Sequence, residues 1–199
     1  MDILKIEAFS GLSGDMFLGA LASLTGDYEA VTTLPARLHL KKEAEVVISE
    51  MNKKGIQCKH VKIVDKNNQG HDHHTHETHA HHHHHRHLKD INIIIDNGDI
   101  SDNAKAIAKK IFLLLGEAES RVHGIPLEKI HFHEVGAIDS MLDIIGTAVL
   151  LDKLKIRKTY CTPINTGHGL VNTEHGRLPV PCPATQILLT GIPTYRGEI

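Results

Sequence analysis

The sequence contains no tryptophan, and aromatic residues make up only 4% of its 199 positions, so its core must be built from aliphatic side chains. Its three cysteines, Cys58, Cys161 and Cys182, form no CxxC pair, which argues against a disulfide framework and a thiolate zinc finger. Lys and Arg number 22 and Asp and Glu number 24. The resulting net charge of −2 gives no reason to expect binding to nucleic acid or to a membrane surface.

Long apolar runs are also missing. The stretch 111–115 is among the longest, and it falls far short of the roughly 20 residues that span a bilayer. Charged residues interrupt positions 1–25, which therefore do not resemble a signal peptide. These absences predict a cytoplasmic protein, and the length suits one domain or two small ones.

Histidine is the abundant residue, with 18 copies, of which 11 lie between positions 71 and 87. The surrounding segment 66–89 has almost no apolar side chains, so it cannot bury enough surface to offset the entropy lost on ordering. We therefore expect a disordered loop there, between a βαββ-like half (1–65) and a helical and mixed half (90–199) packed on the same core. Imidazole is a good ligand for nickel and similar ions, so the loop predicts metal collection, with a passive solvated spacer as the alternative. The candidate ligands are His71, His73, His74, His76, His79, His81, His82, His83, His84, His85 and His87.

Hydrophobic periodicity and turn signals predict an α+β fold. In the first half we expect strands and helices in the order strand, helix, helix, strand, strand, at residues 2–9, 16–24, 27–40, 44–50 and 56–64. In the second half we expect helices at 88–95, 101–122 and 136–154, a returning strand at 158–164, a functional loop at 165–183, a short helix at 183–189 and a last strand at 193–199. Ser101 is expected to cap the helix at 101–122, and residues 52–55, which end in Gly55, are expected to form a hairpin turn between the strands at 44–50 and 56–64. The helix at 136–154 has a wide apolar face, which predicts a central position.

The turn-rich segment 10–15 (SGLSGD) joins the first predicted strand to the first predicted helix. Free N–H groups and the positive end of the helix dipole favour an anion at such a place, although the segment is neither a Walker A motif nor GxGxxG. Ser13, Gly14 and Asp15 are thus candidates to face a phosphate, with a cation between Asp15 and the phosphate. A helix cap formed by Ser13 or Asp15 is the alternative.

A second group of polar residues precedes the predicted helix at 136–154. His131 and His133 point to the same side of an extended segment, and Glu134 and Asp139 add carboxylates close by. Such a set can hold a divalent metal or act as acid and base, while capping by Asp139 and histidine bonds to the backbone are the plainer interpretation.

The predicted loop at 165–183 is rich in glycine, histidine and proline. Glycine lets the backbone approach a ligand closely, so Gly167, His168 and His175 are candidates for ligand contact. Cys182 precedes a predicted helix N-terminus, where a thiolate is favoured, although a buried inert cysteine is the commoner case.

Four segments occur in this order and resemble the LarC family of nickel insertion proteins: FSGLSGDMFLGAL, the histidine-rich stretch, VHGIPLEKIHFHEVGAIDSMLDIIG and HGRLPVPCPAT. The resemblance runs from residue 1 to residue 193 and concerns the N-terminal part of such proteins, which continue into a C-terminal region. Cys182 departs from the family pattern, where a small residue such as alanine is expected.

The resemblance implies a nickel chelatase or cyclometallase of the lyase class. Such a protein inserts Ni²⁺ into pyridinium-3,5-bisthiocarboxylic acid mononucleotide, forming one Ni–C and two Ni–S bonds. CTP and Mn²⁺ or Mg²⁺ are required, with the CTP site in the C-terminal region, and the nickel-pincer product serves lactate racemase. The implied partners are the mononucleotide, the C-terminal region and lactate racemase apoprotein, in an oligomer without nucleic acid or membrane.

Placed on this chemistry, Ser13, Gly14 and Asp15 would face the phosphate or its cation. His131, His133, Glu134 and Asp139 would hold nickel or act as base, and Gly167, His168 and His175 would close over the ligand. Two other functions stay open: a non-catalytic nickel-binding chaperone that delivers metal to a partner, and a metal-dependent phosphohydrolase.

Overall fold

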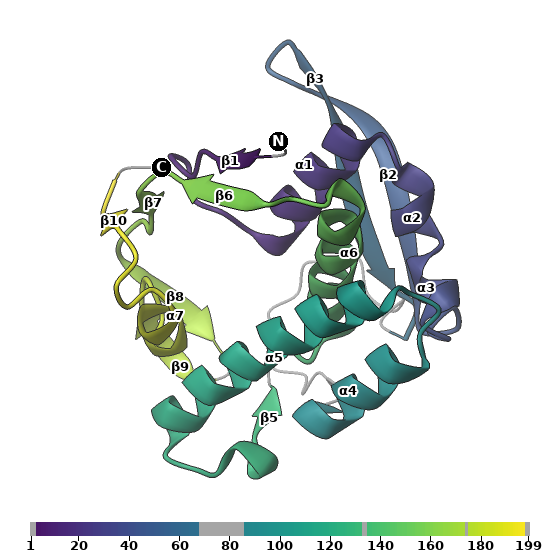
Figure 1. Ribbon diagram of the computed structural model, residues 1–199. Helices are drawn as coiled ribbons and strands as arrows, with labels where there is room; N and C mark the ends of the chain where they lie inside the picture. Colours follow the sequence, from purple (N-terminus) through teal and green to yellow (C-terminus); the bar gives the residue numbers. More distant parts are fainter. Residues whose placement is uncertain (1–2, 68–85, 133–134, 174, 198–199) are drawn as a thin grey trace, which may run out of the picture.

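The computed structural model describes residues 3–67, 86–132, 135–173 and 175–197. Helices and small two-stranded sheets alternate along the chain, which confirms the predicted α+β class (Figure 1). Most of the predicted histidine-rich loop, His133 and Glu134 lie outside the described residues. None of the helices in the described part combines the length and the apolar character needed to cross a membrane.

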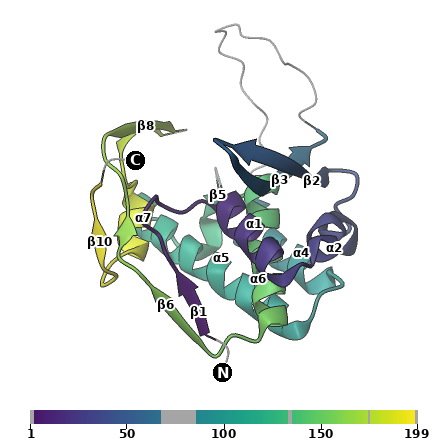
Figure 2. The ribbon, with the colours of Figure 1, turned by 90° about the horizontal axis from the view of Figure 1, so that it is seen from above.

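The core is organised around helix α6 (Ile138–Leu154), which has α1 (Gly14–Thr25) on one side and α5 (Asp102–His123) on the other (Figures 1 and 2). The predicted wide apolar face of α6 is confirmed, because its buried side chains recur on most turns. One hydrophobic cluster joins residues from both halves of the chain, from Leu18 to Leu150.

The first half contains two short helices and a long hairpin. The helix expected at 27–40 is two helices, α2 (Tyr28–Thr32) and α3 (Leu34–Arg37), and Pro35 lies at the start of α3, where its missing N–H costs nothing. Strands β2 (Ala44–Lys53) and β3 (Ile56–Asp65) pair antiparallel over their whole length. Gly55, with a φ of 87°, makes the predicted turn between them.

The first strand does not join that hairpin. Strand β1 (Ile3–Ile6) pairs in parallel with β6 (Lys158–Cys161), the returning strand of the second half. The order strand, helix, strand, strand is therefore present along the chain, but it does not form one sheet. Strand β7 (Ile164–Asn165) continues this ribbon and pairs in parallel with β10 (Thr194–Tyr195).

The second half begins with strand β4 (Arg86–His87) and helix α4 (Leu88–Asn97). Ser101 caps α5 as predicted, since its Oγ accepts a hydrogen bond from the Ala104 N–H at 3.1 Å. A short 3₁₀ helix (Leu127–Lys129) then leads into β5 (His131–Phe132), which pairs antiparallel with β4.

The segment expected to be a loop at 165–183 contains a hairpin of strands β8 (Leu170–Thr173) and β9 (Gly176–Pro179). Each strand has only four residues, so its alternation is too brief to see in the sequence. Helix α7 (Pro183–Leu188) follows, close to its predicted position. The β8–β9 hairpin and α7 lie together, and α7 packs on α5 (Figure 1).

Gly136 is buried where the chain turns from β5 toward α6. A Cβ at this position would lie 2.6 Å from the Phe132 carbonyl oxygen and 3.3 Å from the Arg86 amide nitrogen, both backbone atoms that cannot move away alone. We expect Gly136→Ala to lower the free energy of unfolding by roughly 1–3 kcal/mol in urea titrations. Gly19→Ala is the matched control, since its Cβ would make an ordinary 3.7 Å contact with Val61, and it should be neutral or slightly stabilising. Equal effects of the two substitutions would contradict this account.

Candidate functional site

Three aspartates meet in a hollow of about 270 Å³ beside strand β3. Asp15 lies in the first turn of α1, and Asp139 and Asp143 lie one turn apart at the start of α6. Residues 60–63 of β3, which include His60 and Lys62, form the opposite wall. The structure thus brings Asp15 and Asp139 together, although they come from two segments that the sequence treats separately.

Asp143 is the electrostatically unusual member of this acidic cluster, which we define as Asp15, Asp139 and Asp143. Burial, and to a lesser extent the negative charges of Asp15 and Asp139, together raise its pKa to about 7. Its Oδ1 atom is buried and has no hydrogen-bond partner within the described parts of the chain. The Asp143 carboxyl group can lie this close to the start of α1 because residue 14 is glycine. A Cβ there would lie 2.6 Å from Asp143 Oδ2.

The start of α1 is not closed by a side-chain cap. Ser13 occupies the N-cap position without a capping hydrogen bond, and its hydroxyl instead donates to Asp15 Oδ1. The capped turn considered from the sequence is therefore not formed by Ser13. Because Gly14 has no side chain, the Asp143 carboxyl group can occupy the space beside it.

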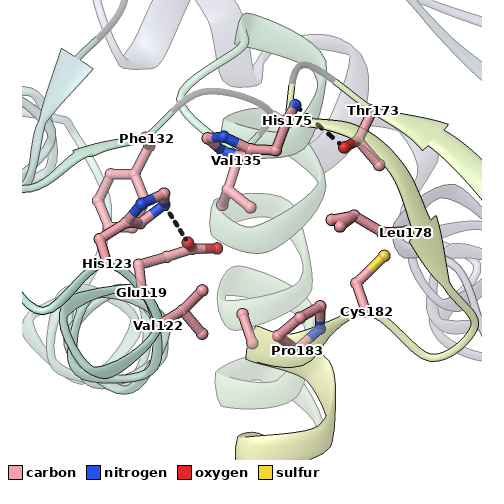
Figure 3. A pocket seen from close by; sticks show the side chains of 11 residues that line it. Glu119, Val122, His123, Phe132, Val135, Thr173, His175, Leu178, Cys182 and Pro183 are labelled. Carbon is pink, nitrogen blue, oxygen red and sulfur yellow. Dashed lines mark hydrogen bonds and ion pairs between the residues drawn. The ribbon is translucent and has the colours of Figure 1, made fainter.

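A second pocket, also of about 270 Å³, lies between α5, the β8–β9 hairpin and α7 (Figure 3). We call it the imidazole pocket, because His123 of α5 and His175 of the β8–β9 turn both line it. Its other lining residues are mainly apolar: Glu119, Val122, Phe132, Val135, Thr173, Leu178, Cys182, Pro183 and Ala184. A mostly apolar pocket with a few convergent polar groups is the usual form of a small-molecule site.

The polar groups of the imidazole pocket contact one another. His123 Nε2 lies 3.4 Å from Glu119 Oε2, one helical turn earlier on α5. The His123 and His175 rings are 4.8 Å apart between centroids, at an angle of 55°. The His175 N–H donates to Thr173 Oγ1 at 3.1 Å, which fixes the turn that carries His175 (Figure 3).

The remaining predicted site residues have other positions. His131 is exposed, lines neither pocket, and packs against His87 with ring centroids 3.9 Å apart. His87 is the one predicted loop ligand within the described residues, and its Nδ1 lies 3.1 Å from the Ile130 carbonyl oxygen. Gly167 is buried and donates its N–H to Asn165 Oδ1, while His168 is exposed. Neither of these two residues lines either pocket.

Sequence reasoning did not single out Glu119, Phe132 or His60 as site residues. Glu119 and His123 are four residues apart on a helix that was predicted, so their shared face was a usable signal. His60 carries no such signal, because its contact with α1 and α6 depends on tertiary packing. Across the described ranges, no three His, Cys, Asp or Glu side chains are grouped closely enough to hold a metal ion by themselves.

These features define a mixed α+β protein with one acidic and one imidazole-lined pocket, a combination suited to handling a cation and a small organic molecule. Comparison with known families is consistent with this chemistry, since the family model described as nickel insertion protein matches residues 4–199. The chain belongs to the nickel insertion protein family.

Two relatives from Thermotoga are named pyridinium-3,5-bisthiocarboxylic acid mononucleotide nickel insertion protein. The protein of Thermotoga sp. strain RQ2 is 45% identical over 98% of this chain and 48% of its own length. The protein of Thermotoga petrophila is 47% identical over 98% of this chain and 47% of its own length. The chain thus spans about half the length of these curated relatives. No solved structure matches it.

The raised pKa of Asp143 gives a test of the acidic cluster. The folded-state pKa of about 7 lies above 3.8, the ordinary value for an aspartate, so ionised Asp143 destabilises the fold at pH 8, and this cost disappears as the pH falls toward 4. We expect Asp143→Asn to stabilise the protein at pH 8 by on the order of 1 kcal/mol, allowing for partial solvent screening. Thermal unfolding from pH 4 to pH 8 measures the gain.

Asp152→Asn is the control, for which we expect a stability change of the opposite sign. Hydrogen bonds from Ser101 and Asn103 lower the pKa of Asp152, so its charged form stabilises the fold above the unfolded-state pKa. This substitution should lower the melting temperature at pH 8, with a smaller effect toward pH 3. A gain from Asp143→Asn that stayed constant across the pH range would refute the electrostatic account.

Proposed function

We propose that the chain is the N-terminal part of a nickel insertion enzyme, a cyclometallase of the lyase class. Its substrates would be Ni²⁺ and pyridinium-3,5-bisthiocarboxylic acid mononucleotide, and its product the nickel-pincer cofactor of lactate racemase. The observation that carries this proposal is the 45–47% identity, over 98% of the chain, to relatives named for insertion of nickel into this compound. The matched region includes both pockets.

The reaction requires few bonds to be formed by the protein itself. Two thiocarboxylates are strong, soft ligands for nickel, so the mononucleotide supplies most of the coordination. The protein must hold the mononucleotide, bring a divalent ion to it and accept the proton lost from the ring carbon that binds nickel. A neutral imidazole or a carboxylate can accept that proton.

The acidic cluster suits a partly hydrated divalent cation. Three carboxyl groups within one hollow create a negative potential, while the lack of a closed chelating group within the described residues leaves coordination positions for water or phosphate. Asp15 and Asp139 would hold the cation, and Ser13 and Gly14 would lie beside the phosphate. The cation would be nickel before insertion, or the Mn²⁺ or Mg²⁺ that accompanies CTP.

We place further roles on the positions of the family motifs. His131, His133 and Glu134 would hold nickel or act as base, and Gly167 and His168 would close over the mononucleotide together with His175. CTP would bind in a C-terminal region, and we expect activity to require that region. Lactate racemase apoprotein would receive the product.

Nickel insertion can be tested with purified chain, the mononucleotide, Ni²⁺ and CTP with Mn²⁺ or Mg²⁺, with and without the C-terminal region. Mass spectrometry should detect a nickel-containing product, formed fully only when both parts are present. Nickel bound without product in either mixture would instead identify a chaperone. Phosphate release from unrelated nucleotides would identify a phosphohydrolase.

In the same assay, Asp15→Ala should reduce product formation at least about tenfold, in the range expected for loss of an electrostatic contact to a reacting group. Asp102→Ala is the matched control, since Asp102 also lies in the first turn of its helix, α5, but lines neither pocket. His133→Ala tests the adjoining segment. Wild-type rates in both Asp15→Ala and His133→Ala would remove the proposed roles.

The histidine-rich segment at 71–87 would collect nickel for the reaction, since eleven imidazoles can bind several ions without fixed geometry. Deleting residues 71–85, which spares strand β4 (Arg86–His87), should lower the nickel bound per chain in equilibrium dialysis while leaving the far-ultraviolet circular dichroism of the remainder unchanged. Unchanged nickel binding would show that the segment is a spacer.

A further inference from the structure

We propose that the imidazole pocket binds the heteroaromatic ring of the substrate, and that His123, positioned by Glu119, accepts the proton released from the ring carbon. This proposal rests on the proposed function and assigns the ring-binding site and the base within it. The observation behind it is the convergence of Glu119, His123 and His175 in an otherwise apolar cavity.

The shape of the pocket suits one flat ring. Val122, Val135 and Leu178 contribute aliphatic walls, Phe132 an aromatic one, and Pro183 a rigid side (Figure 3). A volume of about 270 Å³ lies just below the usual range for small-molecule sites, which suits a substituted six-membered ring but not a whole mononucleotide. The ribose and phosphate would therefore extend out of the pocket.

The charges in the pocket suit a cationic ring. The Glu119 carboxylate points into the cavity beside apolar walls, where its attraction for a pyridinium charge is screened less than in water (Figure 3). Phe132 adds a π surface of the kind that contacts organic cations favourably. The two thiocarboxylates of the substrate are negative, so this attraction acts on the positive ring, and the thiocarboxylates would point away from Glu119.

The Glu119–His123 pair supplies a proton acceptor with a fixed orientation. Glu119 Oε2 lies 3.4 Å from His123 Nε2, at ion-pair distance, so the carboxylate favours the neutral tautomer with its hydrogen on Nε2 and its lone pair on Nδ1. In the insertion step the ring C–H bond breaks, its proton moves to His123, and the electron pair left on carbon forms the bond to Ni²⁺. The step involves no change of oxidation state, and Glu119 balances the charge of the imidazolium that forms.

Cys182 provides a binding assay that does not depend on turnover, because its side chain lines the same pocket. The probe is the bis-carboxylate analogue of the mononucleotide, whose oxygens in place of sulfur do not consume a thiol reagent. Saturating analogue should slow iodoacetamide labelling of Cys182 at least about fivefold, as expected for a largely buried ligand. Labelling of Cys58 and Cys161, which line neither pocket, should not change.

Ala184→Phe fills the pocket from α7, and it should abolish the protection of Cys182 by the analogue. Thr185→Phe adds the same side chain at the next, exposed position of α7, and it should leave protection intact. Each ratio is measured within one variant, with and without analogue, so a change in basal reactivity cancels. Circular dichroism melting curves verify that both variants fold.

The base is tested separately with the C-terminal region present. His123→Gln should lower the kcat of nickel insertion by roughly 10² or more while analogue protection of Cys182 persists, because binding does not need the acceptor. Glu119→Gln should lower kcat less, and Glu119→Asp should restore part of the loss, as expected for a positioning residue.

Two outcomes separate this proposal from the proposed function. Wild-type protein that inserts nickel but shows no analogue protection of Cys182 would overturn the ring-binding site and leave nickel insertion standing. Protection of Cys182 without any nickel insertion would overturn the proposed function and retain the pyridinium site. An unchanged kcat in His123→Gln would overturn the assignment of the base.

Discussion

The packing of α6 between α1 and α5 is the contact on which the rest of the structure depends. Met141, Leu142 and Ile145 are fully buried at this junction, and Gly146 lets Leu18 of α1 approach closely. Because aromatic residues are few, this junction is formed almost entirely by aliphatic side chains, which fit only when the helices lie close together. That fit fixes the start of α6 relative to α1, and with it the distance between the carboxyl groups that each helix carries.

The acidic cluster destabilises the fold, and the packing of α6 offsets this cost. An aspartate placed half-buried beside two other carboxylates destabilises the fold at neutral pH, and no hydrogen bond to Asp143 Oδ1 offsets that cost within the described residues. Gly14 preserves the arrangement, since any other residue would push the Asp143 carboxyl away. A destabilising charge with a strongly shifted pKa, located in a pocket, is typical of a functional site.

Local signals in the sequence predicted the elements well but not their pairing. The Ser101 cap, the Gly55 turn and the apolar face of α6 each depend on neighbours within a few residues, and each agrees with the structure. The parallel pairing of β1 with β6 joins positions about 150 residues apart, and no local pattern encodes it. For the same reason, the sequence could nominate Asp15 and Asp139 individually but could not predict their meeting, or the opposition of His123 and His175.

The segment from β5 to the start of α6 links the two pockets. Phe132 and Val135 line the imidazole pocket, and Asp139, four residues after Val135, lines the acidic hollow. A buried glycine, Gly136, lies between them in close contact with the backbone of β4 and β5. The proposed cation and the proposed aromatic ring would have opposite requirements, since carboxylates attract water that an apolar cavity must exclude. Two pockets joined by this short, tightly packed segment would satisfy both requirements.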